Sequence, residues 1–122
     1  MKYLSMSDRE LEIAVAKTLH LHVEKRCMYN IGTIDVVVIK SGNHPEIIER
    51  VPKYCSSIEG WDIVKRNSID IEWPELSLGG IGSVHKYLEG DTDLQIEFTD
   101  KNDVLRCAMI VYLMWVDKQN EN

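Results

Sequence analysis

The sequence lacks the features that mark secreted, disulfide-stabilised and membrane-spanning proteins. It has no positively charged start followed by an apolar run, so we expect no secretory signal. It has three cysteines, Cys27, Cys55 and Cys107, and their odd number and wide spacing favour free thiols over a disulfide framework. No apolar run reaches the roughly 20 residues that a bilayer-spanning helix needs. These absences predict a cytoplasmic protein with no membrane partner.

The chain also lacks repeats, low-complexity runs and a linker. Its 122 residues fall within the commonest range of domain sizes. Its hydrophobic content of 44% and charged content of 28% are ordinary for a globular protein. We therefore expect a single domain over residues 1–122, with a disordered tail at 118–122.

Several segments carry helix and strand patterns. Ser7 and Glu10 form a capping box ahead of apolar residues at helical spacing, which predicts a helix over 8–21. Ser56 and Glu59 form a second capping box and predict a short second helix. Alternating or β-branched residues predict strands at 34–39, 47–51, 68–73, 84–88 and 94–98. Because sustained β-α-β alternation is absent, the pattern is typical of an α+β domain with an antiparallel sheet.

The most informative segment is the stretch 104–116, which is apolar on every side of a helix except at Arg106. A helix that is apolar all round is buried all round. The segment therefore predicts a C-terminal helix in the centre of the domain. Its end at Trp115 could also pack against a second copy of the chain, so a homodimer is a further prediction.

Arg106 allows two interpretations. An unpaired charge in such a helix would cost several kcal/mol. One interpretation is an internal ion pair with Asp103, Asp100 or an acid of the first helix. The other is an anion site that takes the carboxylate or phosphate of a ligand. The residue types alone leave both open.

The negative charge of the protein is concentrated in one segment. The net charge is −6, and residues 70–103 carry nine acids against two lysines, a net charge of −7. A field of this sign repels the phosphate backbone of nucleic acids. Direct binding to DNA or RNA is therefore disfavoured, whereas a basic protein partner is not. Mimicry of DNA would need the carboxylates to lie along a ridge, which the sequence does not show.

The acidic segment contains a glycine-rich stretch, residues 78–83. A phosphate-binding loop leads into a helix and usually has a lysine beside it. This stretch leads into a predicted strand and has no adjacent lysine, so we interpret it as a flexible loop between strands that a partner could grip. The predicted contact surface combines its glycines with nearby acids: Gly79, Gly80, Gly82, Glu89, Asp91 and Asp93.

Catalytic and metal signatures are weak. His20, His22 and Cys27 could supply part of a metal site, but the second close pair of ligands that a zinc site usually has is missing. We interpret the two histidines as a frayed helix end and predict no metal and no cofactor. A Gly-x-Ser-x-Gly motif is absent, and spacing neither supports nor excludes a Cys–His pair. We therefore predict no catalytic residue.

Three segments of the chain carry a resemblance to a known family. Residues 103–114 look like the C-terminal signature of small tailed-phage proteins of the NinX type, with Asp103, Val104 and Cys107 in place of the usual Asn, Pro and Ala. The segments 54–63 and 6–11 are similar to the middle and the start of that family. The resemblance implies a phage or prophage origin and a product in the cytoplasm of the bacterial host. It implies no particular activity.

Together these observations predict a non-catalytic phage accessory protein that binds a host or phage protein through its acidic segment. The alternative is a small-ligand binder or an enzyme with an anion site at Arg106.

Overall fold

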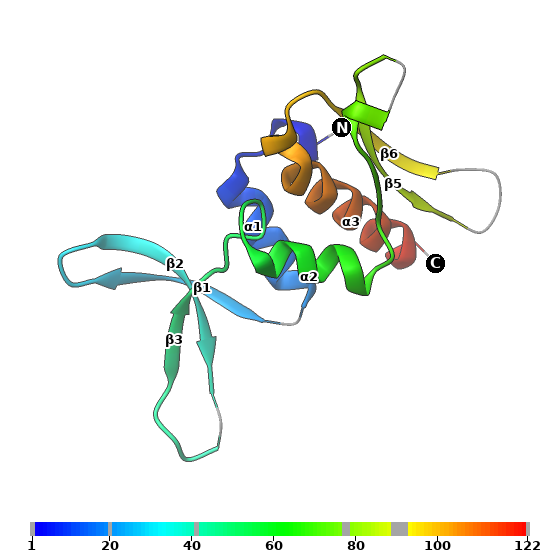
Figure 1. Ribbon diagram of the computed structural model, residues 1–122. Helices are drawn as coiled ribbons and strands as arrows, with labels where there is room; N and C mark the ends of the chain where they lie inside the picture. Colours follow the sequence, from blue (N-terminus) through cyan, green and yellow to red (C-terminus); the bar gives the residue numbers. More distant parts are fainter. Residues whose placement is uncertain (1, 20, 41, 77–78, 89–92, 122) are drawn as a thin grey trace.

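The computed structural model describes residues 2–19, 21–40, 42–76, 79–88 and 93–121 (Figure 1). It is an α+β fold, as the sequence predicts. Two short 3-10 helices, η1 (Tyr3–Ser5) and η3 (Lys101–Asp103), precede α1 and α3, and a third, η2 (Pro74–Leu76), follows β4. The helices and strands are α1 (Asp8–Thr18), β1 (His22–Met28), β2 (Gly32–Ile39), β3 (Ile47–Arg50), α2 (Ile58–Arg66), β4 (Asp70–Glu72), β5 (Gly82–Tyr87), β6 (Asp93–Phe98) and α3 (Val104–Asn120).

Helix α3 lies at the centre of the larger part of the molecule, which we call the body. Helices α1 and α2 pack on it, and β5 and β6 pack on it from another side (Figure 1). Residues 104–113 are buried apart from Arg106, which confirms the predicted central helix. Burial of this much apolar surface is the main source of stability in a small domain.

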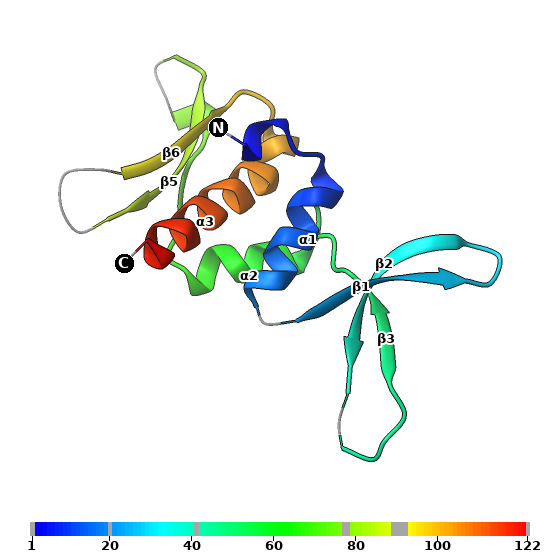
Figure 2. The ribbon, with the colours of Figure 1, turned by 180° about the vertical axis from the view of Figure 1, so that it is seen from behind.

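The strands form two separate three-stranded antiparallel sheets, ordered β1-β2-β3 and β4-β5-β6. The first sheet, which we call the β-arm, projects from the helices in both views (Figures 1 and 2). The second sheet belongs to the body. The sequence predicts one antiparallel sheet, whereas the structure has two, and the second of them packs on α3.

Strand β1 was not predicted. The interpretation of His20 and His22 as a helix end is wrong at His22, which is the first residue of β1. Helix α1 instead ends at Thr18. The sequence pattern for a strand is weak here because charged residues occupy the middle of β1. The turn into β2 contains Asn30 and Gly32 at φ of 64° and 92°, a left-handed backbone that suits these two residue types.

The helix ends match the predictions in part. The capping box is present at the start of α1: the Ser7 hydroxyl accepts from the Glu10 N–H and the Glu10 carboxylate accepts from the Ser7 N–H, each at 3.1 Å. The second capping box is wrong, because α2 starts one residue later and Ser57 precedes it without a side-chain cap. Helix α3 continues to Asn120, so residues 118–120 of the expected tail are helical.

Gly60 fixes how closely α2 approaches its neighbours. A Cβ atom built at this position would lie 1.9 Å from the carbonyl oxygen of Tyr54 and 3.3 Å from Cδ2 of Leu105. A glycine inside a helix costs about 1 kcal/mol relative to alanine. The close contact with the preceding loop is the reason that glycine is required here.

Candidate functional site

The sheet β4-β5-β6 presents one apolar and one polar face. Its strand register places Ile71 opposite Val84 and Val84 opposite Ile96, and this face packs towards α3. The alternate residues share the other face, because side chains of a strand alternate between the two sides of a sheet. This outer face holds Asp70 and Glu72 of β4, Ser83, His85 and Tyr87 of β5, and Asp93, Gln95 and Glu97 of β6.

Four carboxylates therefore lie on one face of this sheet, which we call the acidic face: Asp70, Glu72, Asp93 and Glu97. All four residues are exposed. They occupy the two outer strands and flank β5, where the rings of His85 and Tyr87 contact each other with centroids 4.9 Å apart. The acids thus form two lines with a polar and aromatic strip between them.

No lysine or arginine of the described strands lies on the acidic face. Lys86, on β5, belongs to the opposite face, where its ammonium group donates to the carbonyl oxygen of Asn67 and lies 4.8 Å from the ring centroid of Trp115. Lys101 forms an ion pair with Glu75, outside the sheet. The negative field of the acidic face is therefore not neutralised by a basic side chain within the sheet.

Of the sequence-predicted contact residues that the structure describes, only Asp93 lies on the acidic face. Glu89 and Asp91 lie outside the described residues. The signal for the remaining acids was present in the sequence, because Asp70, Glu72 and Glu97 alternate with apolar residues. The contribution of His85 and Tyr87 depends on the strand register, which a single sequence does not give.

The three glycines play different parts. Gly79 and Gly80 are exposed and precede β5, and Gly80 has a left-handed φ of 69°. Gly82 is buried and is the first residue of β5, where a Cβ atom would lie 2.5 Å from the Phe98 ring and 2.8 Å from the carbonyl oxygen of Glu72. Gly82 is thus required by packing within the sheet. Its inclusion in a flexible loop is wrong.

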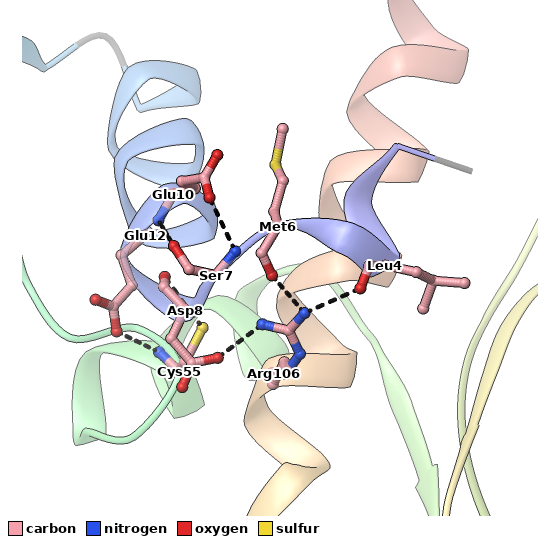
Figure 3. A network of polar contacts seen from close by, with 8 residues as sticks. All are labelled: Leu4, Met6, Ser7, Asp8, Glu10, Glu12, Cys55 and Arg106. Carbon is pink, nitrogen blue, oxygen red and sulfur yellow. Dashed lines mark hydrogen bonds and ion pairs between the residues drawn. The ribbon is translucent and has the colours of Figure 1, made fainter.

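Arg106 forms an internal ion pair, one of its two predicted interpretations (Figure 3). Its guanidinium donates to the Asp8 carboxylate at 2.8 Å and to the carbonyl oxygens of Met6 and Leu4 at 2.5 and 3.3 Å. The Arg106 side chain is 24% exposed and that of Asp8 is 62% exposed. The arginine therefore attaches the N-terminal segment to α3.

A cavity of about 350 Å³ lies beside Arg106, between η1, β6 and α3. Its lining is mostly apolar and includes Asp103 as well as Arg106. The hydrogen bonds of Arg106 also run to groups of its own chain. Both observations weigh against an anion site, because an anionic ligand would have to compete with Asp8 for Arg106 and would meet the carboxylate of Asp103.

A second polar network joins α1 to the loop before α2. The Glu12 side chain is buried, accepts from the Cys55 N–H at 3.2 Å and lies 3.6 Å from the Arg9 guanidinium. Burial raises the pKa of Glu12, while the Cys55 N–H and Arg9 oppose that rise. Arg9 also donates to the carbonyl oxygens of Val51 and Asp35, so it links α1 to β2 and to the residue that follows β3.

The buried cysteines are poor candidates for catalysis. Burial raises the pKa of Cys55 to about 12, and burial also raises the pKa of Cys107. A thiol with a raised pKa is protonated at neutral pH and is a weak nucleophile. All three cysteines are free, as predicted.

The residues considered for a metal site do not converge. His22 and Cys27 lie on β1 at positions of opposite parity, so their side chains point to opposite faces of the β-arm. His22 contacts Glu24 instead, and His20 lies outside the described residues. Among the residues that the structure describes, no group of three or more His, Cys, Asp or Glu side chains could hold a metal ion.

Trp115, which was predicted to pack against a second copy of the chain, is in contact with residues of its own chain. Trp115 is half-buried, lies 6.3 Å from the ring of Tyr112 and has Lys86 over its face.

In the described part of the chain, no helix is both long enough and apolar enough to cross a bilayer.

Comparisons of the chain with protein-family models, with curated proteins and with solved structures found no match. The resemblance to NinX-type proteins therefore stays a prediction.

Proposed function

We propose that this protein is a non-catalytic phage accessory protein that binds a basic surface of a host or phage protein through its acidic face. The supporting observation is the arrangement of that face: four exposed carboxylates on two strands, with no lysine or arginine of the described strands on the same face. The phage origin, and a location in the cytoplasm of the bacterial host, are proposed from the resemblance alone.

The chemistry of the face favours a protein partner. Like charge repels nucleic acid phosphates, whereas opposite charge steers a basic protein towards the face. The strip of His85 and Tyr87 between the acids offers an aromatic surface, which protein interfaces use more often than other surfaces do. The two lines of acids suit a partner segment whose lysines or arginines reach to both sides of that strip.

The test compares two variants that remove the same charge. In the first, Glu72→Gln, Asp93→Asn and Glu97→Gln neutralise three acids of the acidic face. In the second, Glu59→Gln, Asp62→Asn and Glu121→Gln neutralise three exposed acids elsewhere. Each tagged variant and the unaltered protein are used to capture proteins from a bacterial lysate at low and at moderate salt, followed by quantitative mass spectrometry.

We expect a protein that the unaltered chain and the second variant retain at low salt and that the first variant loses. Because exposed charges are screened over about 10 Å at 0.1 M salt, moderate salt should release it as well. The proposal would be wrong if both variants captured the same proteins as the unaltered chain, or if capture were insensitive to salt.

A further inference from the structure

Strand β3 is an edge strand with exposed apolar side chains. Its four residues are all exposed, and Ile47 and Ile48 are 52% and 37% exposed. In both views the β2–β3 hairpin stands clear of the helices (Figures 1 and 2). The outer edge of such a strand offers N–H and C=O groups to another strand, so β3 is a template for pairing with a second chain.

The apolar side chains at this edge extend rows that begin on β2. Ile48 lies opposite Val38 and continues that row on one face of the β-arm. Ile47 lies opposite Ile39, which is also exposed, and continues a row on the other face. A strand added beside β3 would therefore cover apolar surface on both faces of the β-arm.

In one register, two copies of β3 bring residues of opposite charge face to face. Glu49 and Arg50 form no ion pair with other described residues, whereas Glu46 contacts Arg26 at 3.3 Å and Lys40 at 3.6 Å. In an antiparallel pair of identical strands related by a two-fold axis, one residue lies opposite itself. If that residue is Ile48, each Arg50 lies opposite the Glu46 of the other copy.

Neighbouring registers are less favourable. Centring the pair on Glu49 places two like charges directly opposite each other, which destabilises a sheet. Centring it on Ile47 places Arg50 opposite His44 and leaves it without an acid. The register centred on Ile48 joins two isoleucines at the axis and adds two pairs of opposite charge.

We propose that β3 pairs with β3 of a second copy in this register and forms a six-stranded sheet through a two-fold dimer. The contact is independent of the acidic face, because it lies on the other sheet. It is also small, with four residues from each strand, so it belongs to the weak end of protein interfaces. We therefore expect a reversible dimer that is populated at micromolar concentrations.

Disulfide crosslinking tests the register. Cys27 is exposed, so the variants carry Cys27→Ser, and the remaining cysteines are buried. Ile48→Cys places two thiols opposite each other at the axis, and mild oxidation should give a crosslinked dimer. Glu49→Cys, which lies opposite Ile47 in this register, and Ile58→Cys, exposed on α2, are the controls and should give little or none. Equal crosslinking at positions 48 and 58 would overturn the proposal, and crosslinking at 49 in preference to 48 would overturn the register.

Sedimentation velocity measures the association itself. The unaltered protein should shift from one-chain to two-chain mass as its concentration rises. Ile48→Lys should weaken this association by at least about tenfold, whereas the matched variant Ile58→Lys should leave it unchanged, with circular dichroism to verify that both fold. A one-chain mass up to hundreds of micromolar would overturn the dimer.

Discussion

The body and the β-arm are stabilised in different ways. In the body, α1, α2 and the sheet β4-β5-β6 surround α3, whose residues 104–113 are almost all buried. Among the described residues of the β-arm, only residues 36–38 of β2 are buried, and the four residues of β3 are all exposed to some degree. The β-arm is joined to the body through the chain itself, through Val37 of β2 and Val23 of β1, which pack with the core, and through the hydrogen bonds of Arg9.

The two sheets therefore contribute differently to the core. A sheet that packs on a helix contributes its apolar face to the core, as β4-β5-β6 does. A sheet that projects from the core contributes little to it and leaves its edges open to other chains. The acidic face lies on the first kind of sheet and the proposed dimer contact on the second, so the proposed partner binding and the proposed self-association can be tested separately.

The largest expected difference in stability is between shortening an isoleucine in the body and shortening one in the β-arm. Ile110→Ala in α3 should lower the free energy of unfolding by about 2–5 kcal/mol, because it leaves a cavity in a closely packed core. Ile48→Ala in the β-arm should lower it by less than about 1 kcal/mol, because that side chain is already partly in solvent. Urea denaturation followed by circular dichroism measures both, at protein concentrations low enough to keep the chain monomeric. Equal losses would show that the β-arm is part of the core after all.

A smaller effect is expected at the contact between the N-terminal segment and α3. Arg106→Met leaves the carbonyl oxygens of Leu4 and Met6 without their donor, and should lower the free energy of unfolding by about 1–3 kcal/mol. Asp8→Asn removes only the exposed partner and should cost less than about 1 kcal/mol.

The double variant Arg106→Met with Asp8→Asn should therefore remain destabilised, which thermal melting measures. Recovery of the original stability in the double variant would show instead that the unpaired Asp8 carboxylate caused the loss. In that case the carbonyl contacts of Arg106 would contribute little.

The smallest expected effect is a dependence of the free energy of unfolding on pH, which arises from the buried Glu12. Burial raises the pKa of Glu12 above its ordinary value of 4.5, so the folded protein binds this proton more tightly than the unfolded chain does. The free energy of unfolding should therefore fall as the pH rises from the ordinary value through the raised one. Glu12→Gln keeps an acceptor for the Cys55 N–H and removes the titration, so its melting temperature should fall less over that pH range. Parallel curves for the two proteins would contradict this origin of the pH dependence.

Much of the body could be predicted from the sequence, because its patterns are local. The capping box at Ser7, the apolar stretch of α3 and the alternation in β4 and β6 each identified an element of the correct type. The acids of the strands also had the alternation that places them on an exposed face.

The remaining features depend on contacts between distant segments. Strand β1 has a weak pattern of its own and forms through pairing with β2. The division of the strands into two sheets depends on which of them cover α3. The carbonyl partners of Arg106 come from a 3-10 turn at the other end of the chain, which no spacing rule identifies.

Gly60 and Gly82 offer a way to recognise distant relatives of this chain. At both positions a methyl group would collide with backbone of a neighbouring segment, so the geometry tolerates no side chain unless the neighbour moves. A homologue too divergent for overall similarity should still carry glycine at these two places, one within its second helix and the other at the start of the strand that follows the glycine-rich loop. A search for these two glycines, together with an apolar terminal helix that contains one arginine, would use the positions at which the fold tolerates the least change.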